Sequence, residues 1–93
     1  MIAPTIGRRV WYLPTEHDRK SGMAINSGTP QPCDAGIAYV WGDRMVNLTV
    51  ADHSGQMHSR TSVKLLQDED TVPEGMSYAQ WMPYQTGQAK VAA

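Results

Sequence analysis

Cysteine is almost absent from this 93-residue chain, which holds only Cys33, and phenylalanine is absent altogether. Because one cysteine cannot close a disulfide within the chain, the composition favours a reducing compartment, with a reactive thiol at Cys33 as the alternative. The first residues, "MIAPTIGRRVWYLP", lack the apolar core of a signal peptide, and no segment approaches the roughly twenty apolar residues that cross a bilayer. We therefore expect a soluble, cytoplasmic protein.

An excess of charge of one sign is also missing. The chain has 8 Lys and Arg residues against 9 Asp and Glu residues, a formal net charge of −1 and a pI near 6.2. Coating DNA or an anionic membrane through bulk electrostatics requires clustered cations. Bulk DNA binding and membrane binding are therefore not expected, although small basic patches are compatible with these totals.

Motifs that would carry chemistry are scarce. The residues that could bind a metal form no closely spaced pair of the zinc type; they are His17, Asp18, Cys33, His53 and His58. No Ser or Cys lies in a nucleophile elbow, and the glycines have none of the spacings that cradle a phosphate. The sequence thus predicts no metal, no cofactor and no enzyme.

What the sequence does contain is a series of short β-type segments that suits one domain over residues 1–93. We expect strands over residues 6–13, 37–41 and 45–51, a fourth strand after the turn that follows, and a last strand over residues 63–67. The pattern predicts a mostly β fold, a small SH3-like or Tudor-like antiparallel barrel of about five strands. An open antiparallel sheet that completes its core by dimerising is the alternative.

Three segments fall outside the predicted strands. Residues 15–34 are rich in Gly and Pro without an apolar period, which predicts a long mobile loop in which nothing drives packing. Residues 68–75 are expected to form an acidic loop. The tail, residues 76–93, is predicted to carry a short helical turn packed on the barrel, because its aromatic residues lie three apart and Pro83 would break a longer helix.

The turn "DHSG" allows two registers for the strands on either side of it. A type I turn with a glycine bulge pairs Asp52 with Gln56, whereas a tighter turn pairs Asp52 with Gly55. We favour the tighter register, because a slip of one residue would move the charged Arg60 from the solvent face to the core face.

Four segments carry a resemblance to a known group: "PTIGRRVWY", "IAYVWGDRMVNLTV", "HSRTSVKLLQ" and "QWMPYQTGQA". With them the chain resembles small uncharacterised proteins of tailed phages and prophages over residues 4–14, 37–67 and 78–89. It is extended between Pro14 and Ala35 relative to shorter members of that group. The resemblance implies a phage product that acts in the cytoplasm of an infected bacterium, or a minor virion part, and it supplies no catalytic residues.

Hydrogen-bond donors are concentrated in the second hairpin strand. Arg60, Thr61 and Ser62 would form an anion or phosphate site, because a guanidinium presents a planar fork of donors and the hydroxyls add short ones. In the favoured register His58 and Asn47 would lie on the same face as Arg60 and Ser62. Alternatively, these residues form only the solvated outer face of the sheet, because small antiparallel sheets alternate apolar residues that face the core with polar residues that face solvent.

Aromatic residues would complete this site. All seven are Trp or Tyr and carry a polar group, which favours an edge or an interface over a sealed core. Trp41 and Trp11 would stack a nucleobase beside the phosphate. Alternatively, Trp11 and Tyr39 fill the core in place of Phe. The six Met residues would serve as adaptable filler in the core or at a subunit contact.

Two functions are consistent with these features. The first is a non-enzymatic phage accessory protein that binds a small phosphate-bearing ligand and sequesters a nucleotide signal of host anti-phage defence. The second is a protein-interaction or minor virion module that presents Trp41, Trp81 and Tyr84. We also expect a homo-oligomer, because so small a core with so many aromatic residues leaves an apolar patch for a symmetric partner.

Overall fold

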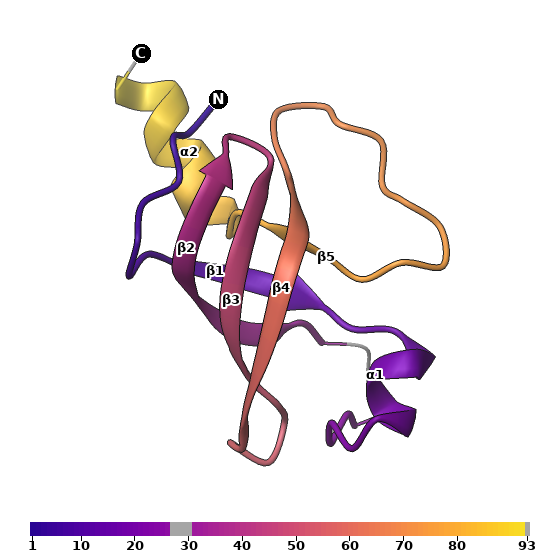
Figure 1. Cartoon of the computed structure of the whole chain (residues 1–93). Coiled ribbons are helices and arrows are strands. Elements are labelled where there is room, and N and C mark those ends of the chain that lie inside the picture. Colours follow the sequence, from indigo (N-terminus) through magenta and orange to yellow (C-terminus); the bar gives the residue numbers. More distant parts are fainter. Residues whose placement is uncertain (27–30, 93) are drawn as a thin grey trace.

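The structure is a computed structural model that describes residues 1–26 and 31–92, with residues 88–92 described by their backbone alone. Its elements are β1 (Arg9–Leu13), α1 (Glu16–Lys20), β2 (Cys33–Gly42), β3 (Met45–Ala51), β4 (Met57–Leu66), β5 (Tyr78–Gln80) and α2 (Pro83–Ala92). The strands close into a barrel in chain order, and β5 pairs with β1. Figure 1 shows β2, β3 and β4 side by side, with β1 and β5 crossing them. The predicted small, mostly β barrel, consistent with an SH3-like fold, is confirmed.

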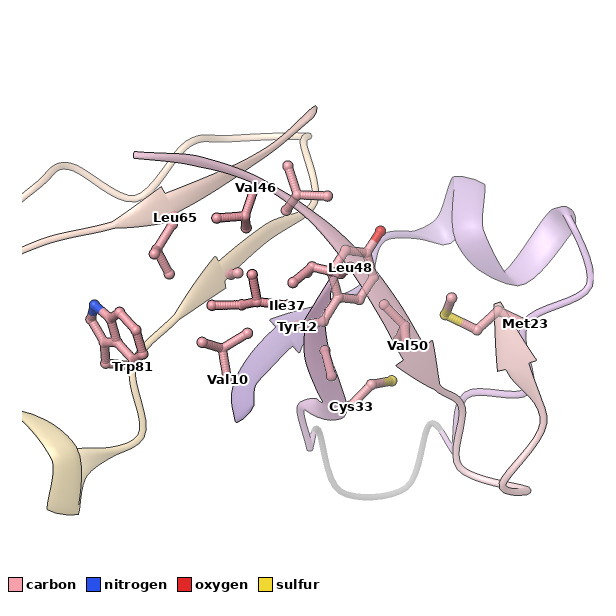
Figure 2. Close-up of a cluster of buried hydrophobic side chains, with 13 residues drawn as sticks. Val10, Tyr12, Met23, Cys33, Ile37, Val46, Leu48, Val50, Leu65 and Trp81 are labelled. Carbon is pink, nitrogen blue, oxygen red and sulfur yellow. The ribbon is translucent and has the colours of Figure 1, made fainter. Parts of the chain in front are cut away.

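Apolar side chains fill the interior of the barrel (Figure 2). β3 contributes Val46, Leu48 and Val50, which the alternation of the strand points inward, as its period of two predicts. The core also holds Val10, Tyr12, Met23, Cys33, Ala35, Ile37, Val63, Leu65, Ala79 and Trp81. With Trp81 only 5% exposed, the interaction surface predicted to include this residue cannot use it.

The strands differ from the prediction in how the barrel closes. β4 runs unbroken from Met57 to Leu66, so the predicted fourth and last strands are one strand. The fifth strand is β5, which comes from the predicted tail and pairs antiparallel with β1 but parallel with β4. The barrel is therefore not entirely antiparallel. A strand of three residues is too short to show a period of two, which is why the sequence pattern did not reveal it.

The predicted long loop contains ordered structure. The Thr15 N–H donates to Asp18 Oδ2 at 2.9 Å, a capping contact at the start of α1. Met23 packs in the core at 1% exposure, and β2 begins at Cys33, inside the predicted loop. The premise that nothing in residues 15–34 drives packing is therefore wrong. Residues 27–30 of that segment lie outside the described residues.

Pro83 begins α2 instead of ending a helical turn. Proline suits the first helical position, because its fixed φ matches the helix and its missing N–H has no partner there. The Met82 N–H donates to Gln85 Oε1 at 2.7 Å, and Gln85 Nε2 donates to the Arg9 carbonyl at 3.0 Å. The first bond stabilises the start of the helix and the second ties it to β1, so that a helix of 10 residues stands where the sequence predicted a short helical turn.

The β3–β4 hairpin adopts the register that pairs Asp52 with Gln56, so the favoured tighter register is wrong. The Asp52 N–H donates to the Gln56 carbonyl at 2.9 Å, and Arg60 lies opposite Leu48 on the core face. Gly55, at φ 91°, closes the turn in the left-handed region. The charge on the core face is tolerated because Arg60 forms an ion pair with Asp18.

A bulge at Thr61 and Ser62 then restores the apolar alternation of β4. The ladder shifts between two pairs, Leu48 with Arg60 and Val46 with Val63, so that two residues of β4 face one of β3. Ser62 adopts a φ of 53°, which is uncommon for a residue other than Gly. The extra residue returns Val63 to the interior, where it is 6% exposed.

Candidate anion-binding pocket

A pocket of about 520 Å³ lies along β4, ahead of the pairing of that strand with β5. Residues 60–64 of β4 form one wall, with Arg44 and Met45 beside them from the turn into β3. Thr15 and His17, at the start of α1, and residues 75–77 complete the lining. Figure 1 shows the chain between β4 and β5 swinging away from the strands before it returns to β5. The pocket therefore gathers segments that are distant in the sequence.

Basic residues gather at the pocket although the chain has a net charge of −1. Four basic residues line it, namely His17, Arg44, Arg60 and Lys64, and four hydroxyl residues lie among them, namely Thr15, Thr61, Ser62 and Ser77. Among the lining residues that the structure describes, none is acidic. Such a set of cations and hydroxyl donors can bind an anion.

Arg60 is held by groups of the protein. Its Nε donates to Asp18 Oδ1 at 2.9 Å, its Nη1 donates to the Ser59 carbonyl at 2.9 Å, and its Nη2 donates to Ser21 Oγ at 3.4 Å. The side chain is 24% exposed. The prediction that Arg60 lies on the solvent face of the sheet is therefore wrong, although the residue does line the pocket.

Asp18 is the buried partner that fixes Arg60. The Tyr12 hydroxyl lies 3.0 Å from each Asp18 carboxylate oxygen and donates to this carboxylate. Burial alone would raise the pKa of Asp18, but hydrogen bonds from the Thr15 amide, Arg60 and Tyr12 outweigh it and lower that pKa below its usual value. Burial raises the pKa of Tyr12. The carboxylate is thus kept ionised, and it orients the guanidinium at the edge of the pocket.

Arg44 is positioned in the same way. Its Nε and Nη2 donate to the two oxygens of Asp70 at 2.8 and 3.3 Å. The hydrogen bonds from Arg44 and from the Gln67 amide lower the pKa of Asp70. Lys64 differs, since it forms no ion pair with any residue that the structure describes. Among the Lys and Arg residues of the described lining it is the one without an ion-pair partner, although its charge helps to lower the pKa of Asp70.

Asn47 supports the pocket wall from the outer face of the sheet. Its Oδ1 accepts the Ser62 N–H at 2.8 Å and the Trp41 Nε1–H at 2.9 Å. The first bond holds the bulge that places Thr61 and Ser62 in the pocket lining. Backbone in a sparsely populated region often marks a functional site, and here a side chain stabilises it.

The other predicted site residues lie outside the pocket lining. Trp41 is 60% exposed and packs edge-on against Tyr39, with ring centroids 4.9 Å apart. Tyr39 is 48% exposed, so it does not fill the core, and Trp11 is half-buried on β1. His58 Nε2 lies 2.8 Å from Asp52 Oδ2, and hydrogen bonds from Ser54 and His58 hold the pKa of Asp52 well below its usual range.

Some of the predicted ligand-binding residues therefore belong to the pocket and others do not. Arg60, Thr61 and Ser62 line the pocket and Asn47 supports it, whereas His58, Trp41 and Trp11 do not contribute. Sequence reasoning missed Arg44 and Lys64, among other lining residues. The sequence did contain a signal for Lys64, because Lys64 follows Ser62 by two residues on the strand that was predicted to supply the hydrogen-bond donors of the site.

Comparison of the chain with protein-family models, curated proteins and solved structures finds no match. Among residues 1–26 and 31–92, no helix is long and apolar enough to cross a membrane. The same residues contain no group of three or more His, Cys, Asp or Glu side chains that could hold a metal ion. Inference about function therefore depends on the pocket and the exposed surface of this chain.

Proposed function

We propose that this protein binds a small phosphate-bearing ligand, without chemical conversion, in the basic pocket along β4. One observation carries the proposal: four basic and four hydroxyl residues converge on a pocket of about 520 Å³ with no acidic residue in its described lining. Charge-assisted hydrogen bonds to a phosphate are among the stronger polar contacts that a surface can offer.

The charge arrangement suits a single phosphate group. Asp70 and Asp18 already neutralise Arg44 and Arg60, so the two guanidiniums act mainly as oriented donors. Lys64 then supplies the net positive charge. The negative charge of a polyphosphate would exceed the positive charge of the pocket. A single phosphate group can instead bind one cation and several hydrogen-bond donors.

The biological setting that we propose follows from the phage resemblance. In an infected cell such a protein would sequester a phosphate-bearing signal of host defence; that this signal is a nucleotide, as expected from the sequence, stays a prediction. The pocket supports the phosphate contact of such a signal. The predicted stacking of a base on Trp41 and Trp11 has no support from the pocket, because neither residue lines it.

Calorimetric titration with inorganic phosphate tests this function. We expect saturable binding by the wild-type protein, weakened by added salt, and about a tenfold loss of affinity in Lys64→Gln, because one charge-assisted hydrogen bond is removed. Lys20→Gln is the matched control, since Lys20 is exposed on α1 outside the pocket lining and its replacement changes the net charge equally. Equal loss in both variants, or no binding by the wild type, would refute the site.

An interaction module is the second candidate, supported by the exposed pair Tyr39 and Trp41 on the outer face of the sheet. Exposed aromatic side chains of this size are enriched at protein interfaces. Of the other two residues predicted for this surface, Trp81 is buried in the core. Tyr84 is 60% exposed but lies apart on α2. The homo-oligomer expected from the sequence stays a prediction, with this aromatic pair as its natural contact.

A further inference from the structure

The basic pocket also has an apolar side. Met45, Val63 and Met76 line it together with the cations. Met45 is 42% exposed and Met76 is 62% exposed, so their thioether side chains are accessible at the pocket. Methionine is unbranched and flexible, and it adapts to apolar ligands of irregular or extended shape.

Charge and apolar surface meet at one position of the sheet. Met45 of β3 is the direct ladder partner of Lys64 of β4, so the two side chains leave the sheet next to each other. A ligand whose phosphate lies at Lys64 would therefore have Met45 within reach of the group attached to that phosphate. Met76, on the segment before β5, lies at the same pocket.

The described lining offers little to a nucleobase. It contains no Trp, Tyr or Phe ring for stacking and no Asn, Gln, Asp or Glu side chain to read a base edge. The imidazole of His17 is the one ring among these lining residues. Base recognition usually combines stacking with hydrogen bonds to a base edge.

We infer that the ligand is a phosphate monoester of an unbranched apolar chain. This inference rests on the proposed function, the binding of a phosphate-bearing ligand, and it replaces the nucleotide expected from the sequence with another class of phosphate ester. The phosphate binds at Lys64 with the Thr61 and Ser62 hydroxyls beside it, and the chain lies along Met45 and Met76. A soluble alkyl phosphate and the headgroup of a single-phosphate lipid share this chemistry.

Calorimetric titrations with inorganic phosphate, n-hexyl phosphate and adenosine monophosphate test the inference. We expect n-hexyl phosphate to bind about tenfold to a hundredfold more tightly than inorganic phosphate, because part of its chain is removed from water. Adenosine monophosphate should stay within about threefold of inorganic phosphate, since the same phosphate contact is made without stacking.

Variants locate the apolar contact. Met45→Ala with Met76→Ala should lose most of the gain of n-hexyl phosphate and keep the affinity for inorganic phosphate. Both residues are exposed, so the fold should survive the change. Met57→Ala is the matched control, because Met57 is 52% exposed and lies outside the pocket lining.

The outcomes separate this inference from the proposed function. If no phosphate compound binds, the proposed function fails. If inorganic phosphate binds but n-hexyl phosphate gains nothing, or adenosine monophosphate binds more tightly than n-hexyl phosphate, the inference on the chain fails and the phosphate site stands. Sedimentation with phosphatidylcholine vesicles, with and without phosphatidic acid, then distinguishes the sources: binding only to the acidic vesicles assigns a lipid, and no vesicle binding assigns a soluble alkyl phosphate.

Discussion

At the scale of single residues, the ion pair of Arg60 with Asp18 explains how β4 holds a charge on the core face of the sheet. An arginine on the core face of a strand would normally be excluded, because a buried charge without a partner is costly. Here the Arg60 Nε lies 2.9 Å from Asp18 Oδ1, and Tyr12 satisfies the same carboxylate. The pair joins α1 to β4 and sets one edge of the pocket.

Arg60→Met should destabilise the protein by about 2 to 3 kcal/mol, since Asp18 would be left buried without its cation. The loss is below that of a fully buried pair because Arg60 is 24% exposed. The double variant Arg60→Met with Asp18→Asn should lose less than Arg60→Met alone, because no unpaired charge remains. Urea denaturation measures both.

Arg19→Met is the control for this comparison. Arg19 pairs with Glu16 at the surface, where an ion pair contributes little. A cost for Arg60→Met no larger than that for Arg19→Met would show that the pair with Asp18 has no structural role.

At the scale of elements, the bulge of β4 determines whether Thr61 and Ser62 reach the pocket. Asn47 accepts the Ser62 N–H and so stabilises a backbone conformation at φ 53°. The bulge also explains how one strand can turn Arg60 and Val63 to the same interior although they are three residues apart.

Asn47→Ala should cost about 0.5 to 1.5 kcal/mol of stability, because two hydrogen bonds are lost at a half-exposed position. It should also weaken phosphate binding severalfold, since Ser62 is no longer held. Thr49→Ala, at the next outward position of β3, changes a residue outside the pocket lining and serves as the control. Unchanged phosphate affinity in Asn47→Ala would mean that the bulge does not position the ligand.

The sequence predicted those elements that are long enough to show a periodic pattern of apolar and polar residues. The alternation in β3 identified its core face, and the donor-rich segment from Arg60 to Ser62 identified a wall of the pocket. It did not reveal β5, whose three residues show no period, or the hairpin register, which depends on Asp18 reaching Arg60 across 42 residues of chain. It also missed Arg44, which only the folded barrel brings together with His17, and Lys64, although Lys64 follows Ser62 by two residues on the same strand.

At the scale of the whole molecule, barrel closure creates the pocket. β4 pairs with β3 along most of its length but with β5 only at Leu65 and Leu66, and residues 60–64, which precede this second pairing, line the pocket. The segment before β5, the start of α1 and the turn into β3 reach this border and supply the remaining lining. A small barrel with a modest core thus presents a basic site without an additional domain.

A phosphate titration followed by ¹⁵N amide chemical shifts tests the central claim most directly. The account predicts saturable shifts concentrated at residues 61–64 and 75–77, which line the pocket. Lys64→Gln should weaken these shifts and Lys20→Gln should leave them unchanged. Saturable shifts centred on Tyr39 and Trp41, or no saturable shifts at all, would contradict the assignment of the pocket along β4 as the phosphate site.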